Sequence, residues 1–457
     1  MLTYELKKEP GVPLYEALYR CIRRDILSGV LKSGDKLPSK RSLAANLEVS
    51  KITVETAYEQ LLSEGYLRSV EKVGYFVEAM EGIAPPQRAV PTQPEAESGE
   101  EIIDLTANGP ADFPFSVWSK LQRQVMLDLG DKLLLPLPNR GILELRHAIA
   151  GHLAAFRGLQ VDPDNILIGA GTDFLYNLLI QLLGRDKCYA VEDPGYGKIR
   201  RIYAAGGVEC VCARMDGQGV RPDSLGSAHV LHISPSHHFP TGLVTPVSRR
   251  RELLNWARES GDRYIIEDDY DSEFRFHAHP MPTMASMDSS GRVIYMNTFS
   301  KTLAPSIRIS YMVLPEALMA QFQQKLGFYS CTVPSFEQYT LARFLSEGHF
   351  EKHINRQRRA YRQRRNRLLE LIAGCPHAPR LTVLEQDAGL HFLVKVDTAL
   401  TDEALIRRCR EALIRVKSLS MYYHEAPAPQ NQRCLVINYS ALGQRQLDLL
   451  EEKLKTL

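Results

Sequence analysis

Apolar residues recur with helical spacing near the start of the chain. Leu14, Leu18, Ile22 and Ile26 are four residues apart, and Gly29 follows them. Because an α-helix turns once every 3.6 residues, this spacing puts the four side chains on one face. It predicts an amphipathic helix that ends near Gly29.

Two further helices and a β-hairpin are expected after this helix. Ser39 and Ser50, which are separated by a short turn at residues 48–49, can each accept hydrogen bonds from the exposed amides at a helix start. Two helices joined by a tight turn form a helix-turn-helix. Alternating apolar and polar residues at 66–70 and 75–77 predict a hairpin wing.

The pattern changes in the rest of the chain to alternating strands and helices. An apolar strand at residues 166–168 is followed by a helix at 173–183 and a strand at 188–191. This rhythm predicts an open, largely parallel α/β sheet wrapped by helices, with ligands at the carboxyl ends of its strands.

A stretch without any apolar period separates these two patterns. Residues 81–101 are rich in Pro, Glu, Gln and Ala, which is typical of a solvated linker. We therefore expect a multidomain protein. Its expected parts are a winged helix-turn-helix at residues 1–80, a linker at 81–101, and a body at 102–457 whose smaller α+β lobe begins near residue 335.

Composition narrows the classes of protein. Of 457 residues, 44% are hydrophobic and 24% charged, which is ordinary for a globular protein. No apolar stretch approaches the roughly 20 residues of a membrane-spanning helix, and the first residues, MLTYELKKEP, lack the apolar core of a secretory signal. We expect a cytoplasmic protein that does not bind membranes. The eight cysteines lack metal-ligand spacing, so no metal site is expected.

The head carries polar residues where a DNA reader needs them. Helix starts, hydroxyls and cations meet phosphates and base edges. The net charge of +2 leaves nucleic-acid binding open, and the alternative is that these are solvated surface residues. The candidate DNA-binding residues are Ser39, Lys40, Arg41, Ser50, Lys51, Thr53 and, in the wing, Gly74.

The head as a whole resembles the GntR-type winged helix. The run LPSKRSLAANLEVSKITVETAYEQLLSEGYL follows that family's pattern, and the resemblance covers residues 12–78. It implies double-stranded DNA as a partner. Lys51 stands where the family usually has Arg, so a phosphate contact is retained there but a bidentate guanine contact is not.

Two loops of the body suit the phosphate and the ring of a flat cofactor. The loop GAGT at residues 169–172 joins a strand to a helix start, where amides and the helix dipole favour a phosphate. In EDPGY, Tyr196 begins the next helix and can stack on a ring. A tyrosine packed in a simple turn is the alternative.

Two further loops suit a pyridine aldehyde. Asp268, at the end of a strand at 264–266, can keep a pyridine nitrogen protonated, and Tyr270 can hydrogen-bond the ring's 3-oxygen. Acidic strand ends are also typical of metal sites. After the strand at 293–296, a desolvated Lys301 can form a Schiff base with an aldehyde, and Arg308 can clamp a phosphate.

The body resembles a fold-type I aminotransferase of the MocR/GabR subfamily, in which this fold follows a GntR head. The segments EDPGY, PSHHFPTG, IIEDDYDSEFRF and TFSKTLAPSIRIS carry the resemblance. It implies pyridoxal 5′-phosphate as cofactor and a head-to-tail homodimer. The implied cofactor residues are Lys301 as Schiff-base lysine, Asp268 at the pyridine nitrogen, Tyr270 at the 3-oxygen, Tyr196 on the ring face, and Gly171, Thr172, Thr298, Ser300 and Arg308 around the phosphate.

Three departures separate the chain from the enzymes of this fold. Phe239, after His238, stands where the enzymes have Asn, and residues 135–137 read LPL where they usually present a Tyr. Val436 stands where an Arg should clamp the substrate's α-carboxylate, although Arg433 is close enough to take that role. Without a bidentate clamp, efficient transamination is not expected.

Three hypotheses follow. The favoured one is a regulator that senses pyridoxal phosphate, or an amine or amino acid, and resembles the PdxR-like members that control vitamin B6 synthesis. The second is an active aminotransferase with an accessory DNA-binding head, and the third is a scaffold without cofactor. A basic helix could add a DNA contact, although a solvated surface is the favoured interpretation. Its arginines are Arg356, Arg358, Arg359, Arg362, Arg364 and Arg365.

Overall fold

The computed structural model describes residues 4, 13–71, 73–78, 101–109, 112–275, 281–385, 389–425 and 432–456. The chain forms two compact units, Met1–Gly99 and Glu100–Leu457. The expected linker at residues 81–101 lies outside the described residues except for Glu101. No helix in the described part of the chain is long and apolar enough to cross a membrane.

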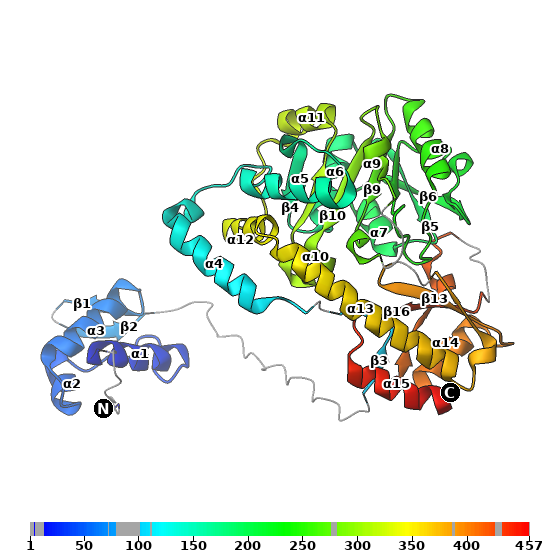
Figure 1. Cartoon of the computed structure of the whole chain (residues 1–457). Coiled ribbons are helices and arrows are strands. Elements are labelled where there is room, and N and C mark those ends of the chain that lie inside the picture. Colours follow the sequence, from blue (N-terminus) through cyan, green and yellow to red (C-terminus); the bar gives the residue numbers. More distant parts are fainter. Residues whose placement is uncertain are drawn as a thin grey trace. The chain divides into compact units, whose positions relative to one another are not determined.

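The first unit is the expected winged helix-turn-helix (Figure 1). Its helices are α1 (Leu14–Leu27), α2 (Lys40–Asn46) and α3 (Lys51–Ser63), and its wing pairs β1 (Leu67–Val70) with β2 (Gly74–Val77) in antiparallel register. Ser39 caps α2 by accepting from the Ser42 amide, and Ser50 caps α3 by accepting from the Thr53 amide. The capping residues therefore set both helix starts, as the sequence predicts.

The core of this unit joins α1 to α3. Leu18, Ile22 and Ile26 are buried on α1, and Val54 and Leu61 are buried on α3. The two helices therefore pack through apolar faces whose side chains recur at helical spacing.

The second unit is built on an eight-stranded sheet with the strand order β4-β11-β10-β9-β8-β5-β6-β7. All neighbouring strands are parallel except β11, which is antiparallel to both of its neighbours, and β7, which is antiparallel to β6. The largely parallel sheet is confirmed. The strands are β4 (Ile166–Gly169), β5 (Cys188–Asp193), β6 (Glu209–Asp216), β7 (Gly219–Val220), β8 (Val230–Ile233), β9 (Tyr264–Asp268), β10 (Val293–Thr298) and β11 (Ser310–Val313).

Helices cover both faces of this sheet because successive side chains of a strand point to opposite faces. Ile266 and Met296 pack with α6 (Thr172–Leu183), α7 (Gly197–Ala205) and α11 (Glu316–Leu326) on one face. Ile265 and Val293 pack with residues of the second face. The helices on this second face are α8 (Val247–Arg258) and α9 (Met284–Met287). Near β4 and β11, the sheet is covered by α5 (Leu143–Arg157) and α12 (Ser335–Ser346). The helix α4 (Phe115–Leu129) packs against α12.

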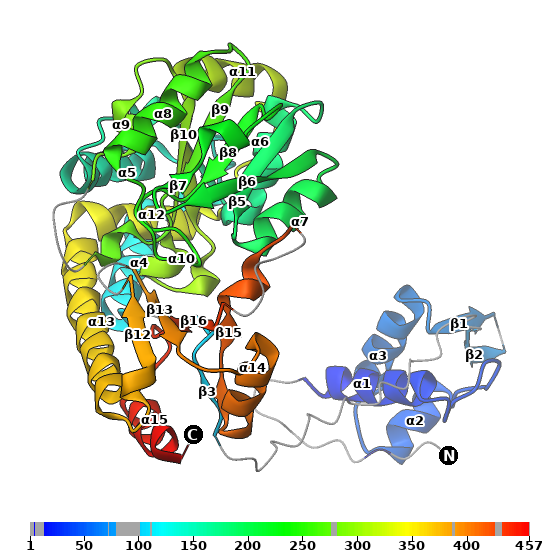
Figure 2. The same ribbon diagram turned by 90° about the vertical axis from the view of Figure 1, so that its right-hand side faces the viewer.

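A smaller lobe contains a four-stranded antiparallel sheet with the order β12-β13-β16-β15 (Figure 2). Its first part in sequence is β3 (Ile103–Asp104), which pairs with β14 (Ile414–Arg415), so the start of the body belongs to this lobe. The expected lobe start near residue 335 coincides with α12, which packs on α4 and α5. The other elements are β12 (Leu381–Leu384), β13 (His391–Val396), β15 (Lys417–Ser418), β16 (Cys434–Asn438), α13 (His349–Gly374), α14 (Asp402–Glu411) and α15 (Gln444–Thr456).

Short helices complete the second unit. They include α10 (Phe299–Thr302), which follows β10 directly, and η5 (Pro305–Ile307), which precedes β11. The remaining ones are η1 (Gly130–Leu134), η2 (Pro163–Asn165), η3 (Pro222–Ser224), η4 (Ser272–Phe274), η6 (Ala378–Arg380) and η7 (Leu419–Tyr422).

Candidate functional site

The predicted cofactor residues converge on one cavity of about 310 Å³ at the carboxyl ends of the parallel strands. Gly171 is not among its lining residues, but it adjoins Arg308: a Cβ added to Gly171 would lie 2.5 Å from the Arg308 Cζ. The predicted residues that line the cavity are Thr172, Tyr196, Asp268, Tyr270, Thr298, Ser300, Lys301 and Arg308.

Asp268, the last residue of β9, has one engaged and one unengaged carboxylate oxygen. Its Oδ2 accepts a hydrogen bond of 2.5 Å from the Tyr176 hydroxyl and lies 3.5 Å from Nε2 of His232. Burial raises the pKa of Tyr176 well above its ordinary value, so the phenol stays protonated and donates. The buried Oδ1 has no hydrogen-bond partner within the described residues. Asp268 therefore fits a ring N–H donor.

A second group of lining residues offers donors that suit a phosphate. Thr172 is the first residue of α6, where the unpaired amides of a helix start attract an anion. The buried Ser300 Oγ has no hydrogen-bond partner in the described part of the chain. Arg308 adds a guanidinium that lies 3.5 Å from the Asp173 carboxylate and leaves 47% of its side chain exposed. Its φ of +50° lies in the left-handed region, a strained backbone state that is typical of functional positions.

Lys301 lies in α10 and lines the same cavity. Its Nζ donates to Oδ1 of Asn108 at 2.6 Å, and the Asn438 amide donates to the same oxygen at 3.0 Å. Burial lowers the pKa of Lys301, although the negative charges of Asp271 and Asp268 act in the opposite direction. A lowered pKa increases the share of neutral amine, which is the nucleophilic form.

The remaining wall is aromatic. The Tyr270 hydroxyl lies 3.4 Å from Nδ1 of His237, and burial raises the pKa of this phenol well above its ordinary value. The ring of Phe239 lies edge-on to Tyr196 and to His391, with centroids 5.9 and 5.0 Å away. Burial lowers the pKa of His391 well below its ordinary value, so its ring is neutral near pH 7. Phe239, which the sequence places where the enzymes are expected to have Asn, contributes a ring that offers no hydrogen bond to this wall.

No arginine stands where an α-carboxylate clamp is expected. Val436 is buried among apolar residues such as Leu393 and Leu419. The Arg433 guanidinium donates to the carbonyl oxygen of Leu400 at 3.2 Å, and Arg433 is not among the residues that line the cavity. Among the described lining residues, Arg308 is the one arginine, and it is the residue that the sequence assigns to the phosphate.

The structure reveals lining residues that the sequence analysis did not identify. Asn108 and Asn438 come from segments far apart in sequence and meet at Lys301. Tyr176 lies three residues inside the predicted helix that follows the GAGT loop. Because it is one helical turn from that loop, its place near the cavity could have been predicted from the sequence. His391 had no sequence signal, because its place depends on how the two lobes meet.

In the head, some of the predicted DNA-binding residues are exposed and others form contacts within the domain. Arg41 and Lys51 are exposed at the starts of α2 and α3. Lys40 is paired with Glu55 at 2.6 Å, and its ammonium lies over the Tyr75 ring. The Ser39 and Ser50 hydroxyls act as helix caps, Thr53 Oγ1 lies 2.8 Å from Ser50 Oγ, and Gly74 begins β2 with a φ of +136°.

The basic helix α13 is not uniformly exposed. Arg358 is half-buried and donates to the carbonyl oxygen of Glu273 at 2.5 Å, and Arg365 is buried. Arg356, Arg359 and Arg362 are exposed. The inward-facing arginines thus have structural partners or burial, which favours a structural role for them over a DNA contact.

Comparisons with known proteins match both units. Residues 100–454 match the family "Aminotransferase class I and II", and residues 14–77 match "Bacterial regulatory proteins, gntR family". The archaeal alanine:glyoxylate aminotransferase structure is similar with a TM-score of 0.68, 22% identity, and coverage of 78% of this chain and 91% of that one.

Curated relatives resemble the chain over nearly its whole length. "Uncharacterized HTH-type transcriptional regulator YdeL" of Bacillus subtilis is 36% identical, with 93% of each chain covered. "Probable rhizopine catabolism regulatory protein MocR" of Rhizobium meliloti is 31% identical, with 97% of this chain and 93% of the relative covered. "HTH-type pyridoxine biosynthesis transcriptional regulator PdxR" of Corynebacterium glutamicum is 30% identical, with 88% and 87% covered.

Proposed function

This chain belongs to the aminotransferase class I and II family and has the gntR-family head of the MocR-type transcription regulators, and on that premise we propose that the state of its pyridoxal phosphate site controls its hold on DNA. The signal is pyridoxal phosphate itself, or an amine or amino acid that reaches Lys301. The observation that carries the proposal is the convergence of a partly buried lysine, an acid and side chains that can donate to a phosphate in one cavity.

The roles of the cofactor residues follow from their surroundings. When bound, pyridoxal phosphate supplies an aldehyde that condenses reversibly with amines and a ring that withdraws electrons. Lys301 would hold it covalently, and Asp268 would accept a hydrogen bond from its ring nitrogen through the unengaged Oδ1. Tyr270 would donate to the 3-oxygen, and Tyr196 would cover the ring. Gly171, Thr172, Thr298, Ser300 and Arg308 would surround the phosphate.

Sensing is favoured over transamination because, in the described part of the chain, neither Val436 nor Arg433 supplies the expected carboxylate clamp. Val436 fills the clamp position with an apolar side chain, and Arg433 is directed to the Leu400 carbonyl. An amino acid that reaches Lys301 would therefore be poorly oriented for proton transfer. The second candidate function, an active aminotransferase with a DNA-binding head, is favoured by the presence of both Lys301 and Asp268 in the lining of one cavity.

Exposed apolar side chains support a homodimer, which we propose to be head-to-tail. Phe115 and Leu127 on α4 are 74% and 75% exposed, and Leu134 and Leu135 just after α4 are 74% and 62% exposed. Large apolar side chains grouped along one segment mark an interaction surface, because in an isolated monomer they would be exposed to water, which is unfavourable. We propose that a second copy of the chain covers this segment.

A spectral titration together with a DNA-binding assay tests the proposal. The holoprotein is expected to absorb visible light, and its band should persist when amino acids are added in turn at millimolar concentration. Stoichiometric conversion to the colourless amine form, with release of a 2-oxo acid, would instead establish the aminotransferase. A protein that stays colourless after reconstitution would show that the body is only a scaffold.

The DNA arm of this experiment addresses regulation directly. Promoter fragments bound by the full chain are mapped with and without pyridoxal phosphate, with Lys301→Ala as the matched variant. We expect the cofactor to change the affinity or the footprint for the native chain and not for Lys301→Ala. An identical footprint in all four samples would contradict the proposal that the body reports to the head.

A further inference from the structure

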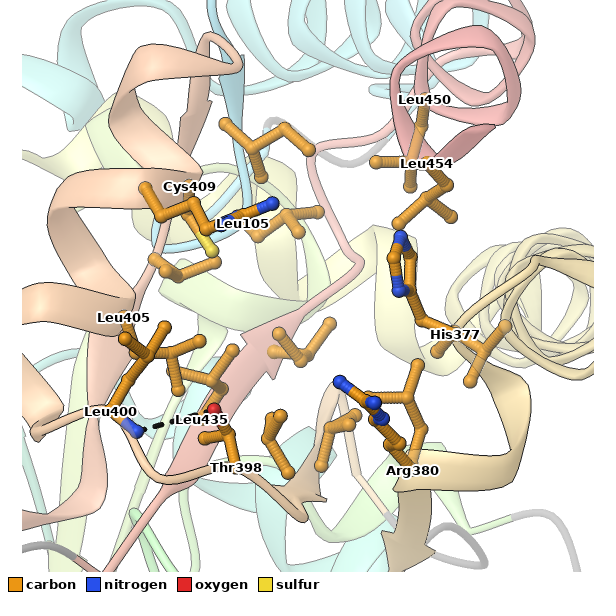
Figure 3. Close-up of a pocket in the computed structure, with 18 of the residues that line it drawn as sticks. Leu105, His377, Arg380, Thr398, Leu400, Leu405, Cys409, Leu435, Leu450 and Leu454 are labelled. Atoms are coloured by element: carbon orange, nitrogen blue, oxygen red, sulfur yellow. Dashed lines mark hydrogen bonds between the residues drawn. The ribbon is translucent and has the colours of Figure 1, made fainter. Parts of the chain in front are cut away.

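The smaller lobe contains a second cavity, of about 220 Å³, which shares no lining residue with the cofactor cavity. It lies between the sheet that contains β13 and β16 and the helices α13, α14 and α15 (Figure 3). Ile437 lines it from the sheet, and Leu368, Leu405 and Leu450 line it from the three helices. All four side chains are buried.

This cavity opens to solvent, but its inner walls are buried apolar side chains of the lobe's core. Protein interiors are close-packed, and voids larger than a water molecule are few. An apolar cavity of roughly 150 Å³ stays dry and accepts a benzene molecule. By that measure the small-lobe cavity has room for a hydrocarbon body of roughly eight carbon atoms. Its buried walls of leucine, isoleucine and valine offer such a body no hydrogen bonds.

The rim of this cavity is more basic than acidic. Arg380, Arg408 and His377 line it, whereas Asp397 is the one acidic residue among its described lining residues. Figure 3 shows Arg380 and His377 on one side of the opening and Leu405 across from them. Arginine is the side chain best suited to hold a carboxylate at an interface with water.

From these two features we propose that the small-lobe cavity binds an apolar monocarboxylic acid of medium length. Its hydrocarbon part lies among Leu405, Cys409 and Ile437, and its carboxylate lies at the rim beside Arg380 and Arg408. This site is separate from Lys301 and needs no covalent step.

The position of the cavity would allow a bound ligand to influence the strand that follows the linker in sequence. Leu105 and Ile414 line the cavity; Ile414 is the first residue of β14, and Leu105 directly follows β3. The Leu105 amide donates to the Arg415 carbonyl oxygen at 2.9 Å, and the Ile103 amide donates to the Leu413 carbonyl oxygen at the same distance. β3 is the first strand after the linker in sequence. An acid that fills the cavity therefore stabilises the strand through which the linker enters the body, independently of the cofactor site.

Calorimetric titration of the full-length holoprotein tests this proposal, with octanoate, octan-1-ol and acetate as probes. We expect octanoate to bind once per chain, octan-1-ol to bind several times more weakly, and acetate not to bind measurably. Arg380→Gln should weaken octanoate binding roughly fivefold and leave octan-1-ol unchanged. Arg410→Gln, which removes the same charge from α14 outside the cavity, should change neither.

Three more variants make the outcome decisive. Asp397→Asn should strengthen octanoate binding, because it removes the negative charge at the rim. Cys409→Phe should abolish binding, because the ring would occupy the cavity. Lys301→Ala should leave octanoate binding unchanged, whereas loss of binding in that variant would show that octanoate enters the cofactor cavity and would overturn the proposal.

Other results would also overturn it. Absence of binding at millimolar octanoate would show that the cavity takes no acid of this size. Equal affinity for octanoate and octan-1-ol, unchanged in Arg380→Gln, would show that the rim does not select a carboxylate. If Cys409→Phe does not fold, as judged by circular dichroism, Arg380→Gln and Asp397→Asn decide between these results, since both change exposed side chains.

Discussion

Replacing Gly171 by alanine should weaken the binding of pyridoxal phosphate and lower the stability of the body. Gly171 precedes α6 with a φ of +90° and a ψ of 164°, a region that side-chain-bearing residues rarely adopt. The new Cβ would lie 2.5 Å from Cζ and 3.0 Å from Nε of Arg308, so the guanidinium must move away. The substitution therefore acts on both the backbone and the proposed phosphate clamp.

Both effects can be given a magnitude. A residue held in a rare backbone region costs about 1–3 kcal/mol, which should appear as a lower free energy of unfolding. Loss of a hydrogen bond to a charged group costs about 1.5–3 kcal/mol in affinity. Because 47% of the Arg308 side chain is exposed, solvent screening favours the lower end of that range. Since 1.4 kcal/mol is a factor of ten, the dissociation constant of pyridoxal phosphate should rise about tenfold.

The assay is a titration of cofactor-free Gly171→Ala protein with pyridoxal phosphate, followed by visible absorption, and a urea unfolding curve. Gly151→Ala in α5 is the matched control, because its Cβ would meet no atom within 4 Å. This control should bind the cofactor as the native chain does and gain about 0.5–1 kcal/mol in stability. A dissociation constant for Gly171→Ala within twofold of the native value would refute the assignment of Arg308 to the phosphate.

Three further predictions concern the lysine and the head. Lys301→Ala should abolish the visible absorption band of the reconstituted protein while pyridoxal phosphate still binds without a covalent bond, as equilibrium dialysis would show. Arg41→Gln and Lys51→Gln should each weaken DNA binding. Each should also reduce by about one the steepness with which the logarithm of the DNA-binding constant falls with the logarithm of the salt concentration. Lys40→Gln should change this slope less, because the Lys40 ammonium is paired with Glu55. Because burial lowers the pKa of Lys301, its reaction with pyridoxal phosphate should already be fast at a pH where an ordinary lysine is protonated. The negative charge of Asp271 raises the pKa of Lys301, so Asp271→Asn should lower this pKa further. In stopped-flow measurements, the rising part of the rate–pH profile of this variant should therefore lie at lower pH.

The elements that the sequence predicts best are those fixed by local chemistry. The serine caps of α2 and α3 are a property of each residue and its next three neighbours, so their positions could be predicted without any tertiary information. The loops after β4, β5, β9 and β10 could be located because buried parallel strands have continuous apolar sequences. Since those strand ends meet at one edge of the sheet, the convergence of their side chains was also predictable.

The features that the sequence did not reveal depend on pairing between distant segments. β3 is only two residues long and has no pattern of its own, and its partner β14 lies about three hundred residues later. Asn108 becomes a neighbour of Lys301 only because this segment and the end of β16 both approach the cofactor cavity. The small-lobe cavity is a property of packing between a sheet and three helices, and side-chain packing is not encoded in a local pattern.

The polar atoms of the cofactor cavity indicate why its occupancy can matter to the head. Asp268 Oδ1, Ser300 Oγ and His391 Nε2 are buried without a hydrogen-bond partner in the described residues. A buried unpaired polar group costs about 1–3 kcal/mol, so a ligand that pairs with two of them stabilises the occupied body by an amount comparable to a functional coupling energy. Lys301 contacts Asn108, and Asn108 is four residues beyond β3, the strand that follows the linker. A change at the lysine therefore reaches the start of the body through one hydrogen bond and a few residues of chain.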